Sequence, residues 1–164
     1  MRTLIVCTIL VFCYLCFSCS SHLIKVPTGA MQPTIKIDAY VLTDENAYQN
    51  NQKIERFDIV IHKRPITDKD KRFGFNENTR FIFRIVGLGG EKVEIKKGQI
   101  FINDNYLTET FEKVSSDDNF GPIVIPESEF FLLGDNRPES EDSRFWKPAT
   151  IKRENIVGKV VKIF

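Results

Sequence analysis

The decisive stretch of the sequence is Gly134-Asp135-Asn136-Arg137-Pro138-Glu139-Ser140-Glu141-Asp142-Ser143-Arg144-Phe145-Trp146. It follows the apolar run from Phe130 to Leu133, which predicts a strand, so its polar residues occupy a loop at the end of that strand. Asp142 and Arg144 are two residues apart, and on an extended chain this spacing puts both side chains on one face. The fold around this loop is predicted from the runs on either side of it.

Short apolar or alternating runs recur along the chain, with turn residues between them, and they are typical of strands. These runs are Tyr40 to Leu42, Asp58 to His62, Phe81 to Val86, Lys92 to Ile95, Gln99 to Ile102, Phe130 to Leu133 and Val157 to Ile163. Turn residues at Lys96-Lys97-Gly98 and Asn103-Asp104-Asn105 predict a β-meander from about Glu91 to Leu107. No later segment shows a long helical apolar stripe, so we expect a mostly β domain with short, peripheral helices.

Two polar stretches are too long for simple hairpin loops. They are Thr43 to Glu55 and Ile66 to Arg80, both rich in Asn, Asp, Lys and Gln. We expect both to be surface excursions from the sheet.

The N-terminal residues differ from the rest of the chain, because Thr3 to Cys19 is uncharged and dominated by Leu, Ile, Val, Phe and Cys. As a helix, Leu4 to Cys19 is roughly 24 Å long, shorter than a hydrocarbon core of about 30 Å. We expect residues 1–22 to be a membrane anchor or signal segment and residues 23–164 to form one β domain. The alternative is a lipoprotein acylated at Cys19. Arg2 favours a cytoplasmic N-terminus, which puts the domain on the periplasmic or extracytoplasmic side.

Composition narrows the classes of function. The 164 residues carry 23 Lys and Arg against 22 Asp and Glu, without a basic patch, so we expect no nucleic-acid partner. All four cysteines precede the β domain, and His22 and His62 are the only histidines. A lone His62 in an apolar run is more often a strand residue than a ligand. We therefore expect no metal site and no cofactor.

Two further stretches complete the pattern. Lys25-Val26-Pro27-Thr28-Gly29-Ala30-Met31-Gln32-Pro33-Thr34 follows the apolar segment, and its prolines and glycine favour a sharply turned loop. The other is Phe83-Arg84-Ile85-Val86-Gly87-Leu88-Gly89-Gly90-Glu91. Arg56-Phe57-Asp58-Ile59-Val60 and Ile156-Val157-Gly158-Lys159 supply two lesser segments.

In their order along the chain, the five segments resemble type I signal peptidases, the leader peptidase family of the serine-lysine dyad class. The three main motifs begin at Lys25, Phe83 and Gly134 and are numbered in that order below. The first resembles Ser-Gly-Ser-Met-x-Pro-Thr, with matches at Gly29, Met31, Pro33 and Thr34. The second is similar to Lys-Arg-Val-Ile-Gly-Leu-Pro-Gly-Asp, with Arg84 matched, and the third to Gly-Asp-Asn-Arg-x-x-Ser-x-Asp-Ser-Arg-Tyr-Trp. The resemblance covers residues 25 to 164 and implies a signal-peptidase-like fold, a complex and partly barrel-like β domain.

The resemblance fails at the two residues that carry the chemistry. In these enzymes a serine attacks the scissile carbonyl and a neutral lysine takes its proton. Ala30 stands at the nucleophile position and Phe83 at the base position, so this chain resembles a member that lacks the dyad. We expect Phe83 to fill the apolar space of the lysine stem.

Most supporting residues of the family pattern are kept. Thr28 replaces the first serine and could offer a hydroxyl beside the Ala30 amide as an oxyanion hole. Ser140 matches the residue that orients the lysine, and Asp142 and Arg144 match a family ion pair near the site. The rest of the motif loop is made up of Gly134, Asp135, Asn136 and Arg137.

The resemblance leaves alternative functions open. One is a membrane-associated pseudoenzyme that binds signal-peptide-like segments as an added strand, or that docks on an active signal peptidase. The other is an active serine-type endopeptidase that removes signal peptides from exported preproteins, with Ala30 an engineered or compensated change. A relationship to self-cleaving repressors is disfavoured, because no helix-turn-helix segment precedes the domain.

Overall fold

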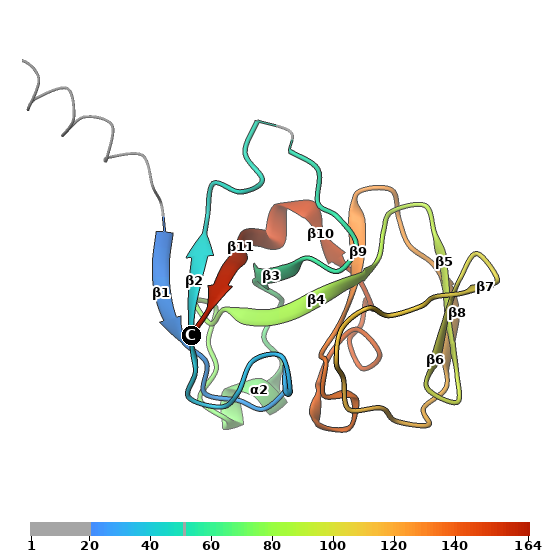
Figure 1. Cartoon of the computed structure of the whole chain (residues 1–164), viewed down its shortest axis with the longest axis horizontal. Coiled ribbons are helices and arrows are strands. Elements are labelled where there is room, and N and C mark those ends of the chain that lie inside the picture. Colours follow the sequence, from blue (N-terminus) through green and yellow to red (C-terminus); the bar gives the residue numbers. More distant parts are fainter. Residues whose placement is uncertain (1–20, 51) are drawn as a thin grey trace, which may run out of the picture.

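The computed structural model describes residues 21–50 and 52–164, which form two antiparallel sheets (Figure 1). The larger sheet has the order β1-β2-β11-β3-β4-β9-β10 and the smaller one β7-β6-β5-β8. The strands of the larger sheet are β1 (Ser21–Lys25), β2 (Tyr40–Asp44), β3 (Ile59–His62), β4 (Phe81–Gly87), β9 (Glu129–Leu133), β10 (Ile151–Lys152) and β11 (Ile156–Ile163). Those of the smaller sheet are β5 (Lys92–Lys96), β6 (Gln99–Ile102), β7 (Asn105–Tyr106) and β8 (Phe120–Val124). The mostly β fold class is confirmed.

Strand β4 is an interior strand of the larger sheet, because β3 pairs with it on one side and β9 on the other. Val60 lies opposite Phe83, and Leu133 opposite Arg84. The strand is rich in β-branched and aromatic residues, and it is buried from Phe83 to Gly87, as expected for a strand covered on both faces.

The predicted meander is confirmed in β5, β6 and β7. Its two turns use left-handed backbone, with φ of 47° at Lys97 and 73° at Gly98, and 49° at Asn103 and 67° at Asp104. Two successive residues at positive φ are typical of the tight turns that match the twist of a hairpin. The turn residues therefore set the register of the smaller sheet.

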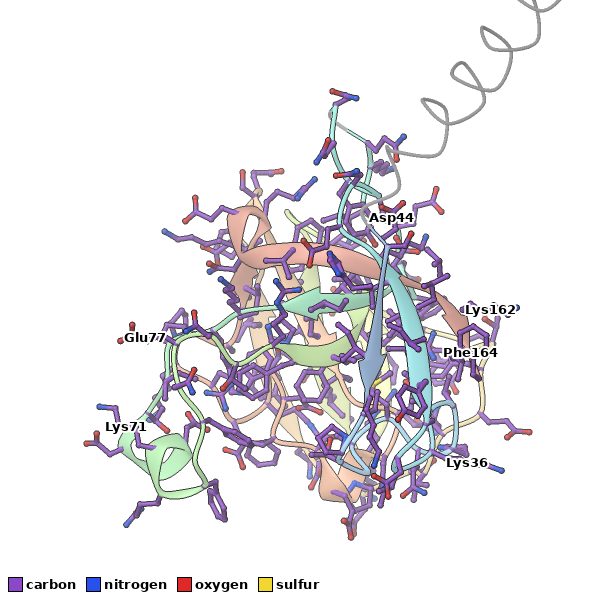
Figure 2. The ribbon with its side chains drawn as sticks, turned by 90° about the vertical axis from the view of Figure 1, so that its left-hand side faces the viewer. Lys36, Asp44, Lys71, Glu77, Lys162 and Phe164 are labelled. Carbon is purple, nitrogen blue, oxygen red and sulfur yellow. The ribbon has the colours of Figure 1, made fainter. Side chains whose placement is uncertain are left out.

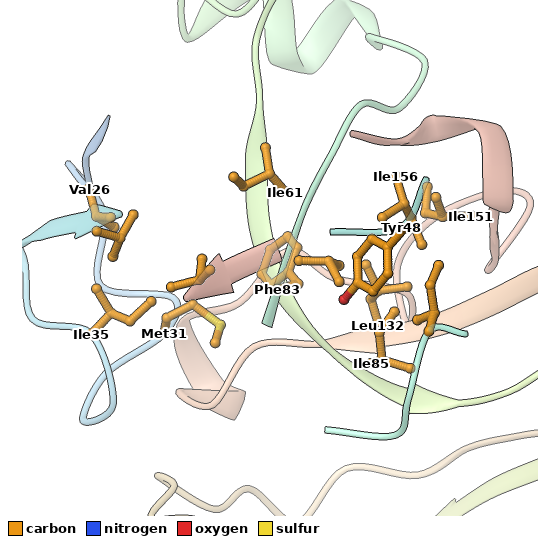
Figure 3. Packing of buried hydrophobic residues seen from close by; sticks show 14 residues of the cluster. Val26, Met31, Ile35, Tyr48, Ile61, Phe83, Ile85, Leu132, Ile151 and Ile156 are labelled. Carbon is orange, nitrogen blue, oxygen red and sulfur yellow. The ribbon is translucent and has the colours of Figure 1, made fainter. Parts of the chain in front are cut away.

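Two hydrophobic clusters share β4 and β9. Ile85 and Leu132 belong to the cluster under the larger sheet, drawn in Figure 3, whereas Val86 and Phe131 belong to the one against the smaller sheet. Successive side chains of a strand point to opposite faces, so these two strands contribute to both clusters.

All the predicted strands are confirmed, and the structure adds β1, β7, β8 and β10. These four lie at the edges of the two sheets. An edge strand has one pairing partner and is often half exposed, so its sequence alternation is weak. β8 also contains Pro122, which is tolerated at an edge because no second partner needs the missing N–H.

Helices are short in the described part of the chain. α2 (Asp68–Arg72) begins at a capping box formed by Thr67 and Asp70, and the turns η1 (Arg137–Glu139) and η2 (Arg153–Asn155) are single 3-10 turns. The excursion that contains α2 leaves the body of the domain near Lys71 and Glu77 (Figure 2).

The expected anchor or signal segment, with Cys19, lies outside the described residues except for Ser21 and His22. These two belong to β1, where Ser21 lies opposite Asp44 and His22 opposite Thr43. Within residues 21–50 and 52–164, no helix has the length and apolar character needed to cross a membrane.

Candidate functional site

The loop that contains Ala30 is fixed from below by two buried side chains. Met31 is 1 % exposed and Ile35 is fully buried, and the Ile35 N–H donates to the Met31 carbonyl at 2.8 Å. Both belong to the hydrophobic cluster that also contains Phe83 (Figure 3). Ala30 is half-buried against this cluster, whereas Thr28 and Pro33 are exposed.

The loop after β9 clamps the backbone of Ala30. The Asn136 N–H donates to the Ala30 carbonyl at 3.0 Å, and the Asn136 side-chain amide donates to the Gly29 carbonyl at 3.1 Å. Ser140 Oγ lies 2.9 Å from the same Ala30 oxygen and 2.7 Å from the Asn136 carbonyl, so its single proton serves one of two main-chain acceptors.

Gly134 makes this close packing possible. A Cβ added at Gly134 would lie 1.8 Å from Ser140 Oγ and 2.5 Å from the Ala30 carbonyl oxygen. No side chain fits in that space, so a glycine is required where the two loops meet.

One buried ion pair joins all three motifs. Arg84 donates from Nε to Asp135 Oδ1 at 2.8 Å and from Nη2 to Asp135 Oδ2 at 2.6 Å. The Thr34 hydroxyl donates to Asp135 Oδ2 at 2.5 Å. Arg84 and Asp135 side chains are 8 % and 1 % exposed, so this is a fully desolvated bidentate pair. It is a structural link, because Arg84 also donates to the Phe57 carbonyl at 2.9 Å.

Phe83 occupies an aromatic environment. Its side chain is 5 % exposed, and its ring centroid lies 5.7 Å from that of His62 and 5.7 Å from that of Trp146. His62 ends β3 and is fully buried, and burial lowers its pKa to about 3. His62 is therefore neutral at physiological pH and sits among rings.

Asp142 and Arg144 form an ion pair with N–O distances of 2.8 and 2.9 Å. The two residues lie in a turn, in which the Phe145 N–H donates to the Asp142 carbonyl at 2.9 Å. The expectation that they share one face of an extended chain is therefore wrong. Burial raises the pKa of Asp142, while Arg144 and the Gly134 N–H stabilise its charged form. Asp142 thus holds the start of the motif loop through the Gly134 N–H at 3.1 Å.

Sequence reasoning missed a segment, residues 107–119, that lies over the motif loop and is called the strap below. Arg137 pairs with Glu109 and donates from Nε to the Gly134 carbonyl at 2.9 Å, and Arg144 donates to Asp118 at 2.5 Å. The Phe111 ring lies 3.8 Å from the Arg84 guanidinium. Nothing local in the sequence around Glu109 signals these contacts.

No metal-binding arrangement occurs in the part of the chain that the structure describes, where no three His, Cys, Asp or Glu side chains converge. The chemistry available near Ala30 is hydrogen bonding by backbone and hydroxyl groups.

One edge of β4 is open beside this site. β9 pairs with β4 at Arg84, Ile85 and Gly87, and then turns away at Gly134 towards Ala30. Residues Phe81 to Phe83 pair with β3 alone. Along Phe81 to Phe83, β4 therefore has no strand partner on its β9 side among the described residues.

The fold and this arrangement of motifs define a signal-peptidase-like β domain. The family model described as "Signal peptidase, peptidase S26" matches residues 1–164, and the chain belongs to this family. The matched range includes the three motifs that meet at Ala30, Arg84 and Asp135.

Relatives of established name support the assignment. A signal peptidase I of Leptolyngbya laminosa is 33 % identical over 139 residues, which are 85 % of this chain and 66 % of the relative. The thylakoidal processing peptidase 1 of Arabidopsis thaliana is 37 % identical over 138 residues, 84 % of this chain and 40 % of the relative. The chain therefore spans about two-thirds or less of the length of these relatives.

A solved structure shares the fold. The crystal structure of a signal peptidase I from Enterococcus faecalis V583 has a TM-score of 0.50 and 28 % identity, and the match covers 67 % of this chain and 98 % of that one.

Proposed function

We propose that this chain is a signal-peptidase-family protein that binds signal-peptide-like segments without cleaving them. The single observation that carries the proposal is the pair Ala30 and Phe83 at the positions of the family nucleophile and base. Ala30 has no oxygen for attack and Phe83 has no proton acceptor.

The surroundings of Phe83 support the loss of the base. The rings of His62 and Trp146 lie against it, and the Ser140 hydroxyl is hydrogen-bonded to backbone carbonyls. His62 is a neutral imidazole, but Ala30 leaves it nothing to activate.

The arrangement of the three parts of the site supports a role in peptide binding. The Ala30 loop, the motif loop and the open edge of β4 are held together by the Arg84–Asp135 pair. An extended peptide would add to β4 through main-chain hydrogen bonds. Thr28 and the Ala30 N–H would lie near its carbonyl, as a remnant of an oxyanion hole.

Membrane association is part of the proposal. The uncharged run from Thr3 to Cys19 would hold the domain at the periplasmic or extracytoplasmic surface, either as an uncleaved anchor or through a lipid on Cys19. Mass spectrometry of the mature N-terminus distinguishes these two forms.

The decisive experiment is restoration of the dyad. We expect the natural chain to leave a preprotein uncut, and Ala30→Ser with Phe83→Lys to cleave it, because a lysine buried among rings has a lowered pKa and is a competent base. Each single substitution is the matched control and should remain inactive. Cleavage by the natural chain would instead establish the alternative, an active serine-type endopeptidase that uses other residues.

Peptide binding is tested separately by hydrogen exchange. A peptide ending in Ala-Gln-Ala should slow exchange of the amides of residues 81–83 and leave the meander unaffected. Unchanged exchange of the amides of residues 81–83 at saturating peptide would contradict the proposed peptide binding.

A further inference from the structure

A cavity of about 520 Å³ lies between the chain that leaves β3 and the segment that joins the motif loop to β11. Its walls include Arg64, Trp146, Pro148, Ile151, Lys152 and Asn155, and it is called the Trp146 pocket below. Ala30 and Phe83 are not among its lining residues. The pocket is thus separate from the residues of the family dyad.

Arg64 brings an unused donor to this pocket. Its side chain is 7 % exposed, and Nη1 and Nη2 donate to the Asp70 carboxylate at 2.8 and 2.7 Å. Arg64 Nε is buried and has no hydrogen-bond partner among the described protein atoms. A buried N–H without an acceptor costs roughly 1–3 kcal/mol, so a ligand that supplies an acceptor gains from binding here.

The charges favour a neutral ligand. Arg64 is already neutralised by Asp70, and the Thr150 hydroxyl donates to Glu129. The charged lining residues are Arg64, Lys147 and Lys152 against Asp70, Glu129, Glu141 and Glu154. The positive and negative side chains nearly balance, so the pocket does not favour a charged ligand. A peptide carbonyl provides a hydrogen-bond acceptor without net charge.

The aromatic and aliphatic side chains of the pocket favour an apolar group on the ligand. Phe145, Trp146, Pro148 and Ile151 contribute apolar surface, and the Arg64 guanidinium lies 5.5 Å from the Trp146 ring and 4.6 Å from the Phe81 ring. A large apolar side chain next to a main-chain carbonyl matches both the apolar lining and the free Arg64 Nε donor.

Two residues that line the pocket contact side chains of the open edge of β4. Phe81 begins the stretch of β4 that pairs with β3 but not with β9, and the Arg64 guanidinium lies over its ring. Trp146 contacts the ring of Phe83. A peptide added along this edge therefore passes next to the pocket.

We propose that the Trp146 pocket receives a large apolar side chain of the polypeptide bound along β4, with Arg64 Nε donating to a main-chain carbonyl of that polypeptide. The inference rests on the proposed function, and it names a preference for one large apolar residue upstream of the C-terminal end of the bound peptide.

The test uses Trp146, the only tryptophan of the chain, as the reporter. The probes are acetylated peptides that end in Ala-Gln-Ala, with one Phe scanned through an upstream run of alanines. We expect one Phe position to change the emission of Trp146 and to bind roughly tenfold more tightly than the all-alanine peptide.

Two variants assign this gain to the pocket. Arg64→Lys keeps the charge but removes Nε, and should weaken the Phe peptide roughly tenfold. Arg80→Lys is the matched control, because Arg80 pairs with Glu45 and does not line the pocket. Asn155→Phe fills the pocket, and should remove the Phe preference even if Arg64→Lys lowers the melting temperature.

Each outcome has one meaning. Equal affinity at every Phe position, or a Phe preference that survives in both Arg64→Lys and Asn155→Phe, overturns the pocket. Binding of every Phe peptide, seen by slowed exchange at residues 81–83, without a change in Trp146 emission at any Phe position overturns the pocket and leaves the proposed function standing. No binding of any peptide overturns both.

Discussion

His62 and Phe83 are neighbours in a group of rings completed by Phe81 and Trp146. Ring centroids in this group lie 5.4 to 5.8 Å from His62, in tilted and stacked geometries. Such contacts add about 0.5–1.5 kcal/mol each beyond the area they bury. A phenylalanine at position 83 therefore suits the interior, whereas an ionised lysine there would lose its hydration.

His62 makes the stability of the domain dependent on pH. Its folded pKa of about 3 lies below the ordinary value of 6.5, so below pH 6.5 the unfolded chain binds a proton that the folded chain does not. The resulting stability is complete above pH 6.5 and is lost as the pH falls towards 3. We expect the free energy of unfolding to drop by about 2 kcal/mol between pH 7 and pH 5, measured by urea denaturation.

His62→Phe should remove this drop, because a phenylalanine fits among the rings and does not titrate. His22→Gln is the control, since His22 is exposed on β1 and should leave the drop in place. If His62→Phe keeps the full pH dependence, His62 is not the group responsible.

The strap is the element that holds the motif loop closed. The Val114 N–H donates to the Asp135 carbonyl at 2.9 Å, and the Arg137 N–H donates to the Val114 carbonyl at 3.0 Å. Glu109, whose side chain is 2 % exposed, pairs with both Arg137 and Lys113. Arg137 and Arg144 thus form ion pairs with the strap, and the strap covers the loop that clamps Ala30.

Glu109→Gln should loosen this element. The substitution leaves Arg137, with a side chain that is 3 % exposed, without its carboxylate, at a cost of about 3 kcal/mol. We expect the Val114 amide to exchange faster and the melting temperature to fall. Glu112→Gln is the matched control on an exposed residue of the same strap. Equal behaviour of the two variants would mean that Glu109 does not hold the strap.

At the scale of the whole molecule, the two hydrophobic clusters are coupled through β4 and β9. Each strand sends alternate side chains to each cluster, as Ile85 and Val86 do. A domain whose clusters share two central strands should unfold in a single transition.

Ile100→Ala tests this coupling. Ile100 is fully buried on β6 in the cluster of the smaller sheet, so its truncation costs about 3 kcal/mol. We expect the thermal midpoint to fall by roughly 8 °C, equally for far-UV circular dichroism and for the emission of Trp146, which packs against the other cluster. Val124→Ala, at a 68 % exposed position of β8, should change little. Separate midpoints for the two signals would show that the sheets unfold independently.

The central strands, the hairpin turns and the family are recognisable from the amino-acid sequence alone. Alternation over 81–86 and 99–102 is a local pattern, and each needs only the residues of one strand to be recognised. The motif loop from Gly134 to Trp146 was equally evident. The loss of the dyad at Ala30 and Phe83 stays a prediction.

The edge strands and the contacts that join the motifs depend on the tertiary structure. β1, β7, β8 and β10 exist because a neighbouring strand pairs with them, and their own residues carry little alternation. The contact between Arg84 and Asp135 spans 51 residues, and that between Ser140 and Ala30 spans 110. Such pairs leave no trace in local spacing, because folding alone brings their partners within hydrogen-bond distance.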